Sequence, residues 1–320
     1  MDNDRAQPSQ GIVMADFGRG SRNHIGRRIP RISRLDRNAY AVITDCAMLL
    51  ALAAALRFAW LGHASLWIDE LFSVHWAQLD LAFLLGEGAR TETNPPTYYV
   101  LLQGWMKLAG MTEGAIRALS VLVSMATVLV VYALGRVMWD RATAVLAGVL
   151  LAVNPVSVMF AQEARAHALS ALLNGLALLL FVISSHHSST TRAPSWKWLP
   201  AFIVAVMATV LVHYASLLFV AACFAAAGLR LVGTRPFPIR EMAVWSLAGI
   251  ITFLGLWQVL ILVAGLAGSN NLVWIEPLSA KGVAAFFLDL TVPLSRTPPL
   301  LAVAWGSLAA LLLIVVLGLP

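Results

Sequence analysis

The sequence predicts an all-α fold, a bundle of helices that crosses a lipid bilayer several times. Of its 320 residues, 60% are hydrophobic and only 12% are charged, and the mean hydropathy is +0.80. A soluble domain is about half apolar and a quarter charged, so this chain has too few polar side chains to cover a water-soluble protein of its size. The apolar residues also form blocks of about 20 residues, the length that a helix needs to cross a bilayer.

The apolar blocks divide into eight predicted spans. The join at His213-Tyr214-Ala215 could lie within a single helix of about 35 residues, but that length exceeds the bilayer, so a tight hairpin is the better interpretation. The predicted spans are 40–61, 115–137, 142–160, 166–183, 198–213, 215–232, 241–266 and 299–319.

Two shorter amphipathic segments, 70–86 and 96–109, lie between the first two spans. They are short for crossing a bilayer and better suited to its interface. We therefore expect the first outer loop to contain amphipathic juxtamembrane helices.

The positive charge of the chain, formally +6, is concentrated in the polar, Arg-rich residues 1–38 and in short loops. Lys and Arg are distributed in this way when they set membrane topology, so nucleic-acid binding is not indicated. We expect 1–38 to be a disordered cytoplasmic tail and 39–320 to be a multi-pass domain in the cell membrane. The apolar run reaches Pro320 without a polar tail, which is compatible with a chain that continues further.

This orientation places the polar motifs of the sequence on the extracytoplasmic side, although they were not used to set it. Charged residues at or within a membrane are candidates for function, and their convergence on one side predicts one site. The motifs are Asp69-Glu70, Asn94-Pro95-Pro96, Gln162-Glu163-Ala164-Arg165, His213-Tyr214 and Trp274-Ile275-Glu276-Pro277.

Asp69 and Glu70 are the candidate catalytic residues. A carboxylate at a membrane face can accept the proton of a sugar hydroxyl and make it a nucleophile. The sequence does not decide which of the two points into a site, and an acidic pair can simply mark the end of a span.

The segment from Glu163 to His167 is predicted to open a span as a helix. Glu163 would be stabilised by the helix dipole in the first turn, whereas Arg165 would be opposed by it. An arginine in that position suggests an anionic partner such as a phosphate. Glu163 and His167 would share a helix face; a divalent metal could bridge them, and a hydrogen-bonded packing pair is the simpler interpretation. No cofactor is certain from the sequence.

Three further residues are candidate ligand contacts. Asn94 precedes two prolines that suit the start of a helix. His213 could donate to a phosphate, or belong to an interfacial His-Tyr turn. Trp274 could stack on a sugar, although an aromatic belt at the interface is the better interpretation.

At these motifs the sequence resembles the multi-spanning C-type glycosyltransferases related to protein O-mannosyltransferases and to the lipid A aminoarabinose transferase. The likeness extends over residues 40 to 280 and also includes Trp67-Ile68 before Asp69, Thr97-Tyr98-Tyr99 after the prolines, and Glu113 to Arg117. This family often has His where this chain has Asn94, and Tyr where it has His167.

The resemblance implies transfer of a sugar from a polyprenyl-phosphate donor to a glycan, lipid or protein acceptor at the outer face. Asp69 matches the family's catalytic carboxylate, and Arg165 and His213 match positions near the donor phosphate. Two alternatives remain: a flippase or other transporter of lipid-linked sugars, and an inactive scaffold subunit. A transporter should carry ionisable residues near mid-bilayer, and the predicted spans hold few, with Arg57 close to a span end.

Overall fold

The computed structural model describes residues 34–92, 94–185, 196–232 and 238–267, and all regular secondary structure in these ranges is helical. The chain divides into two compact units, Met1–Ala41 and Val42–Pro320. Helix α1 (Arg34–Phe58) begins in the first unit, within the predicted tail, and continues in the second. The all-α fold class is therefore confirmed.

Three described helices are long and apolar enough to cross a membrane: Asn38–Phe58 of α1, α6 (Glu113–Met138) and α9 (His167–Ser185). The count rises to five if each of two bent helix pairs is one span. Two shorter apolar helices accompany them, α10 (Leu199–Val212), which follows the 3₁₀ turn η2 (Trp196–Trp198), and α11 (Ser216–Val232). The predicted span 299–319 lies outside the described residues.

Two predicted spans are broken rather than continuous. The span 142–160 consists of α7 (Arg141–Val153) and α8 (Pro155–Ala161), bent by 60°. The break lies at Asn154, whose Oδ1 accepts the N–H of Ser157 at 2.8 Å and caps α8, while Pro155 cannot continue α7. The span 241–266 is bent by 56° between α12 (Ile239–Gly255) and α13 (Trp257–Ala267). The predicted hairpin at residues 213–215 is confirmed, because α10 ends at Val212 and α11 begins at Ser216.

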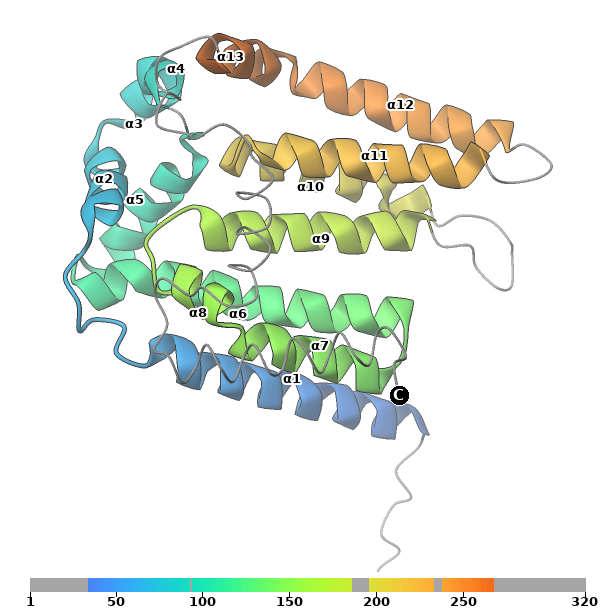
Figure 1. Cartoon of the computed structure of the whole chain (residues 1–320), viewed down its shortest axis with the longest axis horizontal. Helices are drawn as coiled ribbons and strands as arrows, with labels where there is room; N and C mark the ends of the chain where they lie inside the picture. Colours follow the sequence, from blue (N-terminus) through green and yellow to red (C-terminus); the bar gives the residue numbers. More distant parts are fainter. Residues whose placement is uncertain (1–33, 93, 186–195, 233–237, 268–320) are drawn as a thin grey trace, which may run out of the picture. The chain divides into compact units, whose positions relative to one another are not determined.

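The segment between the first two spans folds into short helices. The predicted amphipathic piece 96–109 is one of them, whereas the predicted piece 70–86 is divided among several. These helices lie together at the end of the bundle where α8 leads into α9 (Figure 1). They are α2 (Ile68–Gln78), α3 (Leu81–Phe83), the π-helical turn η1 (Leu84–Gly88), α4 (Ala89–Thr91) and α5 (Thr97–Ala109).

Helix α6 is central to the packing, because it contacts α7, α9 and α5, and α9 in turn packs against α10 and α11. The close approach of α6 and α7 requires a glycine: a Cβ added at Gly135 would lie 2.6 Å from Cα of Ala144. Small residues allow such approaches between membrane helices. Helix α1 joins this group through a core that includes Leu49, Ala53 and Val128.

Helix α1 is also attached to α7 by a polar contact. Asp45 is 4% exposed and accepts two hydrogen bonds of 2.8 Å from Arg141 and one of 2.9 Å from the hydroxyl of Tyr132. A paired carboxylate of this kind fixes the position of α1 against α6 and α7, which in turn sets where the chain leaves α1 for the polar motifs.

Candidate active site

Asp69 and Arg165, which are far apart in the sequence, form an ion pair of 2.7 Å. Asp69 lies in the first turn of α2, where a helix dipole stabilises a carboxylate. Arg165 lies in the loop between α8 and α9. Their side chains are 41% and 21% exposed, so both groups are accessible at the end of the bundle. The structure thus brings together Asp69, the predicted base, and Arg165, the residue predicted to bind the donor phosphate.

The loop that carries Arg165 is not helical, which corrects our prediction. Helix α8 ends at Ala161 and α9 begins at His167, so Glu163 and Arg165 precede the helix and Glu163 does not share a helix face with His167. Long-range hydrogen bonds hold this loop in place. The N–H of Ala164 donates to Glu70 at 2.9 Å, and the Gln162 amide donates to the carbonyls of residues 57 and 59 at 3.1 and 2.9 Å.

Glu70 is fully buried beneath this loop and is committed to structural bonds. Arg117 on α6 donates to its two carboxylate oxygens at 2.8 and 2.6 Å. Its oxygens also accept the N–H groups of Trp67 and Ala164. The Arg117 guanidinium further donates to the carbonyls of Leu61, Ala64 and Ser65. This pair therefore fixes the start of α2, the segment before it and the Arg165 loop relative to one another.

Two histidines lie near Arg165. His167 is the first residue of α9 and His213 follows α10, and their ring centroids are 6.0 Å apart. The Nδ1 atom of His213 accepts the N–H of Ala215 at 3.3 Å. Burial, and secondarily the charge of Arg165, lower the pKa of His213. A neutral imidazole that accepts at Nδ1 keeps Nε2–H as a donor, which suits contact with an anionic ligand.

A narrow hollow joins these groups, and Asn94 lies on its wall together with Arg165, His167 and His213. Glu92, which we did not select from the sequence, is only 7% exposed and accepts hydrogen bonds from the Asn94 amide at 3.1 Å and from the Tyr99 hydroxyl at 3.3 Å. The same carboxylate, after burial, raises the pKa of Tyr99. The signal in the sequence was an acid two residues before the Asn-Pro-Pro motif.

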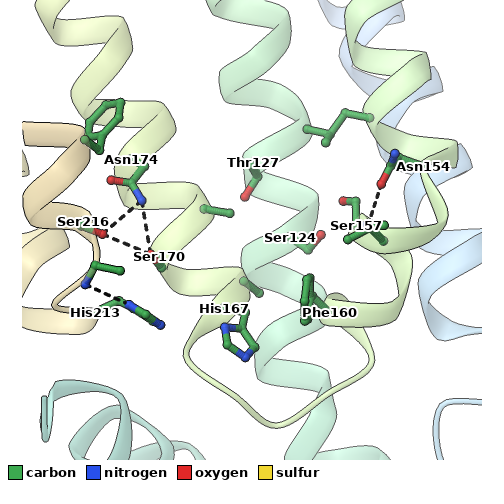
Figure 2. Close-up of a pocket in the computed structure, with 16 residues that line it drawn as sticks. Ser124, Thr127, Asn154, Ser157, Phe160, His167, Ser170, Asn174, His213 and Ser216 are labelled. Atoms are coloured by element: carbon green, nitrogen blue, oxygen red, sulfur yellow. Dashed lines mark hydrogen bonds between the residues drawn. The ribbon is translucent and has the colours of Figure 1, made fainter. Parts of the chain in front are cut away.

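A much larger cavity, of about 710 Å³, opens on the bundle side of the same two histidines. Figure 2 shows its polar side chains, which come from α6, α8, α9 and the start of α11, and from Asn154 before α8 and His213 after α10. Asn174 donates to Ser170 and Ser216 at 3.2 Å and accepts from Thr209 at 2.8 Å. Sequence analysis missed these residues because isolated hydroxyls within apolar spans look like packing positions.

Not every predicted residue can be placed in this site. Glu163 is buried, with 9% exposure, and is not among the residues that line the hollow, and Trp274 lies outside the described residues. Within the described ranges, no group of three or more His, Cys, Asp or Glu side chains is placed to hold a metal ion.

The family model of the dolichyl-phosphate-mannose-protein mannosyltransferases matches residues 93–261, more than half of the chain. The matched segment includes Asn94, Arg165, His167 and His213, whereas Asp69 precedes it. None of the curated proteins matches the chain. The chain therefore belongs to the dolichyl-phosphate-mannose-protein mannosyltransferase family, and it is a membrane glycosyltransferase that uses polyprenyl-phosphate sugar donors.

Proposed function

We propose that the protein transfers a sugar from a polyprenyl-phosphate donor to a cell-envelope glycan, lipid or protein on the extracytoplasmic face, with inversion of the anomeric configuration. The observation that carries this proposal is the accessible pair of Asp69 and Arg165. It places a carboxylate that can take a proton beside a guanidinium that can bind a phosphate, at the end of the bundle where α8 leads into α9.

The reaction needs a base and an anion-binding group. The acceptor oxygen attacks the anomeric carbon while Asp69 takes its proton. The bond from the anomeric carbon to the phosphate oxygen breaks, and its electron pair leaves with the polyprenyl phosphate. Arg165 would bind the phosphate bidentately, and His213 would donate to it. Attack opposite the departing phosphate inverts the anomeric configuration.

The ion pair suggests the order in which the two substrates bind, with the donor before the acceptor. Asp69 and Arg165 are bound to each other at 2.7 Å, so neither is fully available to a substrate. A donor phosphate offers Arg165 a stronger, bidentate partner. Donor binding would therefore release Asp69 for the acceptor hydroxyl, and the base would be freed only when the donor is in place.

Transfer is tested with membranes that contain the protein and radiolabelled polyprenyl-phosphate sugars. Label that moves from the lipid to a glycan, lipid or protein fraction supports the proposal and identifies the acceptor class. Label that crosses the membrane while still attached to its lipid would support a flippase instead. Label that remains in place would leave a scaffold subunit as the better description.

Arg165→Ala should weaken donor binding by about a hundredfold, because breaking one end of a charge-assisted pair costs on the order of 3 kcal/mol. Arg165→Lys should restore only part of the affinity, since an ammonium group lacks the bidentate geometry. The dissociation constant of the donor is the measurement. Lys107→Ala, which removes an exposed cation on α5, is the matched control. Wild-type donor affinity in Arg165→Ala would end the assignment.

The orientation can be tested by cysteine labelling from outside intact cells, in a background without Cys46 and Cys223. Glu87→Cys, an exposed position in η1, should react with an impermeant maleimide, whereas Ser188→Cys and Ala142→Cys should react only after permeabilisation. Labelling of Ser188→Cys or Ala142→Cys in intact cells would reverse the topology and place the site on the cytoplasmic side.

A further inference from the structure

Arg57, near the end of α1, is a fully buried cation whose described hydrogen bonds all go to neutral oxygens. Its Nε donates to Ser124 Oγ at 2.9 Å and its Nη1 to the Ala152 carbonyl at 2.7 Å. Its Nη2 donates to Ser157 Oγ at 2.9 Å and to the Leu151 carbonyl at 3.3 Å. No carboxylate in the described part of the chain forms an ion pair with it.

The two carbonyls offset this charge only in part. Leu151 and Ala152 belong to the last turn of α7, which ends at the Asn154 break, so Arg57 caps a helix C-terminus. Such an end carries a partial negative charge equivalent to about half an elementary charge. An excess of positive charge remains in a low-dielectric region, where an uncompensated ion is strongly disfavoured.

The hydroxyls of Ser124 and Ser157 lie between the Arg57 guanidinium and the large cavity. Both oxygens accept a hydrogen bond from Arg57, so each hydroxyl proton points elsewhere, and no acceptor for either is found among the described residues. Both residues line the cavity (Figure 2). Thr127 also lines it, but its hydroxyl is already used, because it donates to the Val123 carbonyl at 3.1 Å.

The cavity therefore offers two polarised donors backed by a cation. Its volume of about 710 Å³ exceeds that of a phosphate, and the rest of its wall includes apolar side chains such as Val156, Phe160 and Phe219. His167 and His213 line both this cavity and the hollow that contains Arg165, so the two spaces adjoin at one histidine pair.

We propose that this cavity binds the phosphate of the polyprenyl phosphate that leaves the reaction, with Ser124 and Ser157 as donors and Arg57 as the positioning residue behind them. The inference rests on the proposed function. The donor is a phosphodiester with one negative charge, whereas the released monoester carries between one and two at neutral pH. A buried cation therefore favours the product over the donor, and the apolar wall receives the first isoprene units.

The test is binding to the purified full chain in lipid nanodiscs, with farnesyl phosphate, farnesol and inorganic phosphate as probes. In the double variant Ser124→Ala/Ser157→Ala, affinity for farnesyl phosphate should fall at least tenfold while affinity for farnesol is unchanged. A general loss of folding would lower both affinities, so this difference isolates the phosphate. Thr127→Val is the matched control and should bind all probes like the wild-type protein.

Three results would overturn the inference: wild-type affinity for farnesyl phosphate in the double variant, an equal loss for farnesol, and equal loss in Thr127→Val. Inorganic phosphate that binds as tightly as farnesyl phosphate would overturn the lipid occupant. Sugar transfer by the wild-type protein is scored separately. If the protein transfers sugar but farnesyl phosphate binding does not depend on Ser124 and Ser157, only this inference is refuted. If binding depends on the two serines but no sugar is transferred, only the proposed enzyme activity is refuted.

Discussion

Asp69→Asn should lower turnover by about 10²–10⁴-fold at saturating donor, the usual contribution of a general base. The amide keeps the size and much of the hydrogen bonding of the carboxylate but cannot accept the acceptor's proton. Donor affinity should stay close to that of the wild-type protein or rise slightly, because Arg165 loses the ion pair that competes with the phosphate. The turnover number and the donor dissociation constant are measured on the same preparation.

Glu87→Gln is the matched control for this substitution. It removes an exposed carboxylate from the same segment of the chain and should leave turnover unchanged. Normal turnover in Asp69→Asn would show that the base is not Asp69. If turnover then depended on neither Asp69 nor Glu70, the general base would not come from the first outer loop.

The sequence predicted the features that depend on local composition. Long apolar blocks with few charges gave the helical membrane fold, and the break at residues 213–215 followed from bilayer thickness alone. Asp69, Arg165 and His213 were selected from separate motifs. In the structure, Asp69 forms an ion pair with Arg165, and Arg165 and His213 line the same hollow.

What the sequence could not supply are the contacts between distant residues. Glu163 and Arg165 were expected in a helix, but the hydrogen bond from the Ala164 N–H to Glu70, 94 residues away, belongs to a non-helical loop. Tertiary contacts of this kind override local propensity. The bend at Asn154 did have a local signal, the Asn-Pro pair, whereas the bend at Leu256 followed only a glycine.

Arg57 was misjudged for a different reason. In the sequence, Arg57 was noted only as lying close to a span end, where an arginine is usually able to extend its side chain to the interface. Its burial depends on where α7 ends, because the carbonyls of Leu151 and Ala152 in the last turn of this helix accept hydrogen bonds from the guanidinium. Only the packing of α1 against α6–α8 brings these groups together.

Glu70→Gln should destabilise the protein by about 3–5 kcal/mol, because it leaves Arg117 as a buried cation without its counter-ion. The Glu70 side chain is 0% exposed and accepts both hydrogen bonds from Arg117 as well as the N–H of Ala164. Activity should fall with stability, since the Arg165 loop and the start of α2 would lose their common anchor. The midpoint of denaturation in detergent is the measurement, with Glu87→Gln again as the control.

A double-mutant cycle with Arg117→Met separates structure from catalysis at this position. Removing both charges relieves the unpaired cation, so Glu70→Gln/Arg117→Met should be less destabilised than the sum of the two single variants. Turnover per folded molecule at low temperature should then be lowered in parallel in all three variants, because each disturbs the same anchor. A different result would contradict this structural role. If Glu70→Gln had wild-type stability but turnover reduced a hundredfold or more, Glu70 would be the base. Asp69 would then serve only to hold Arg165.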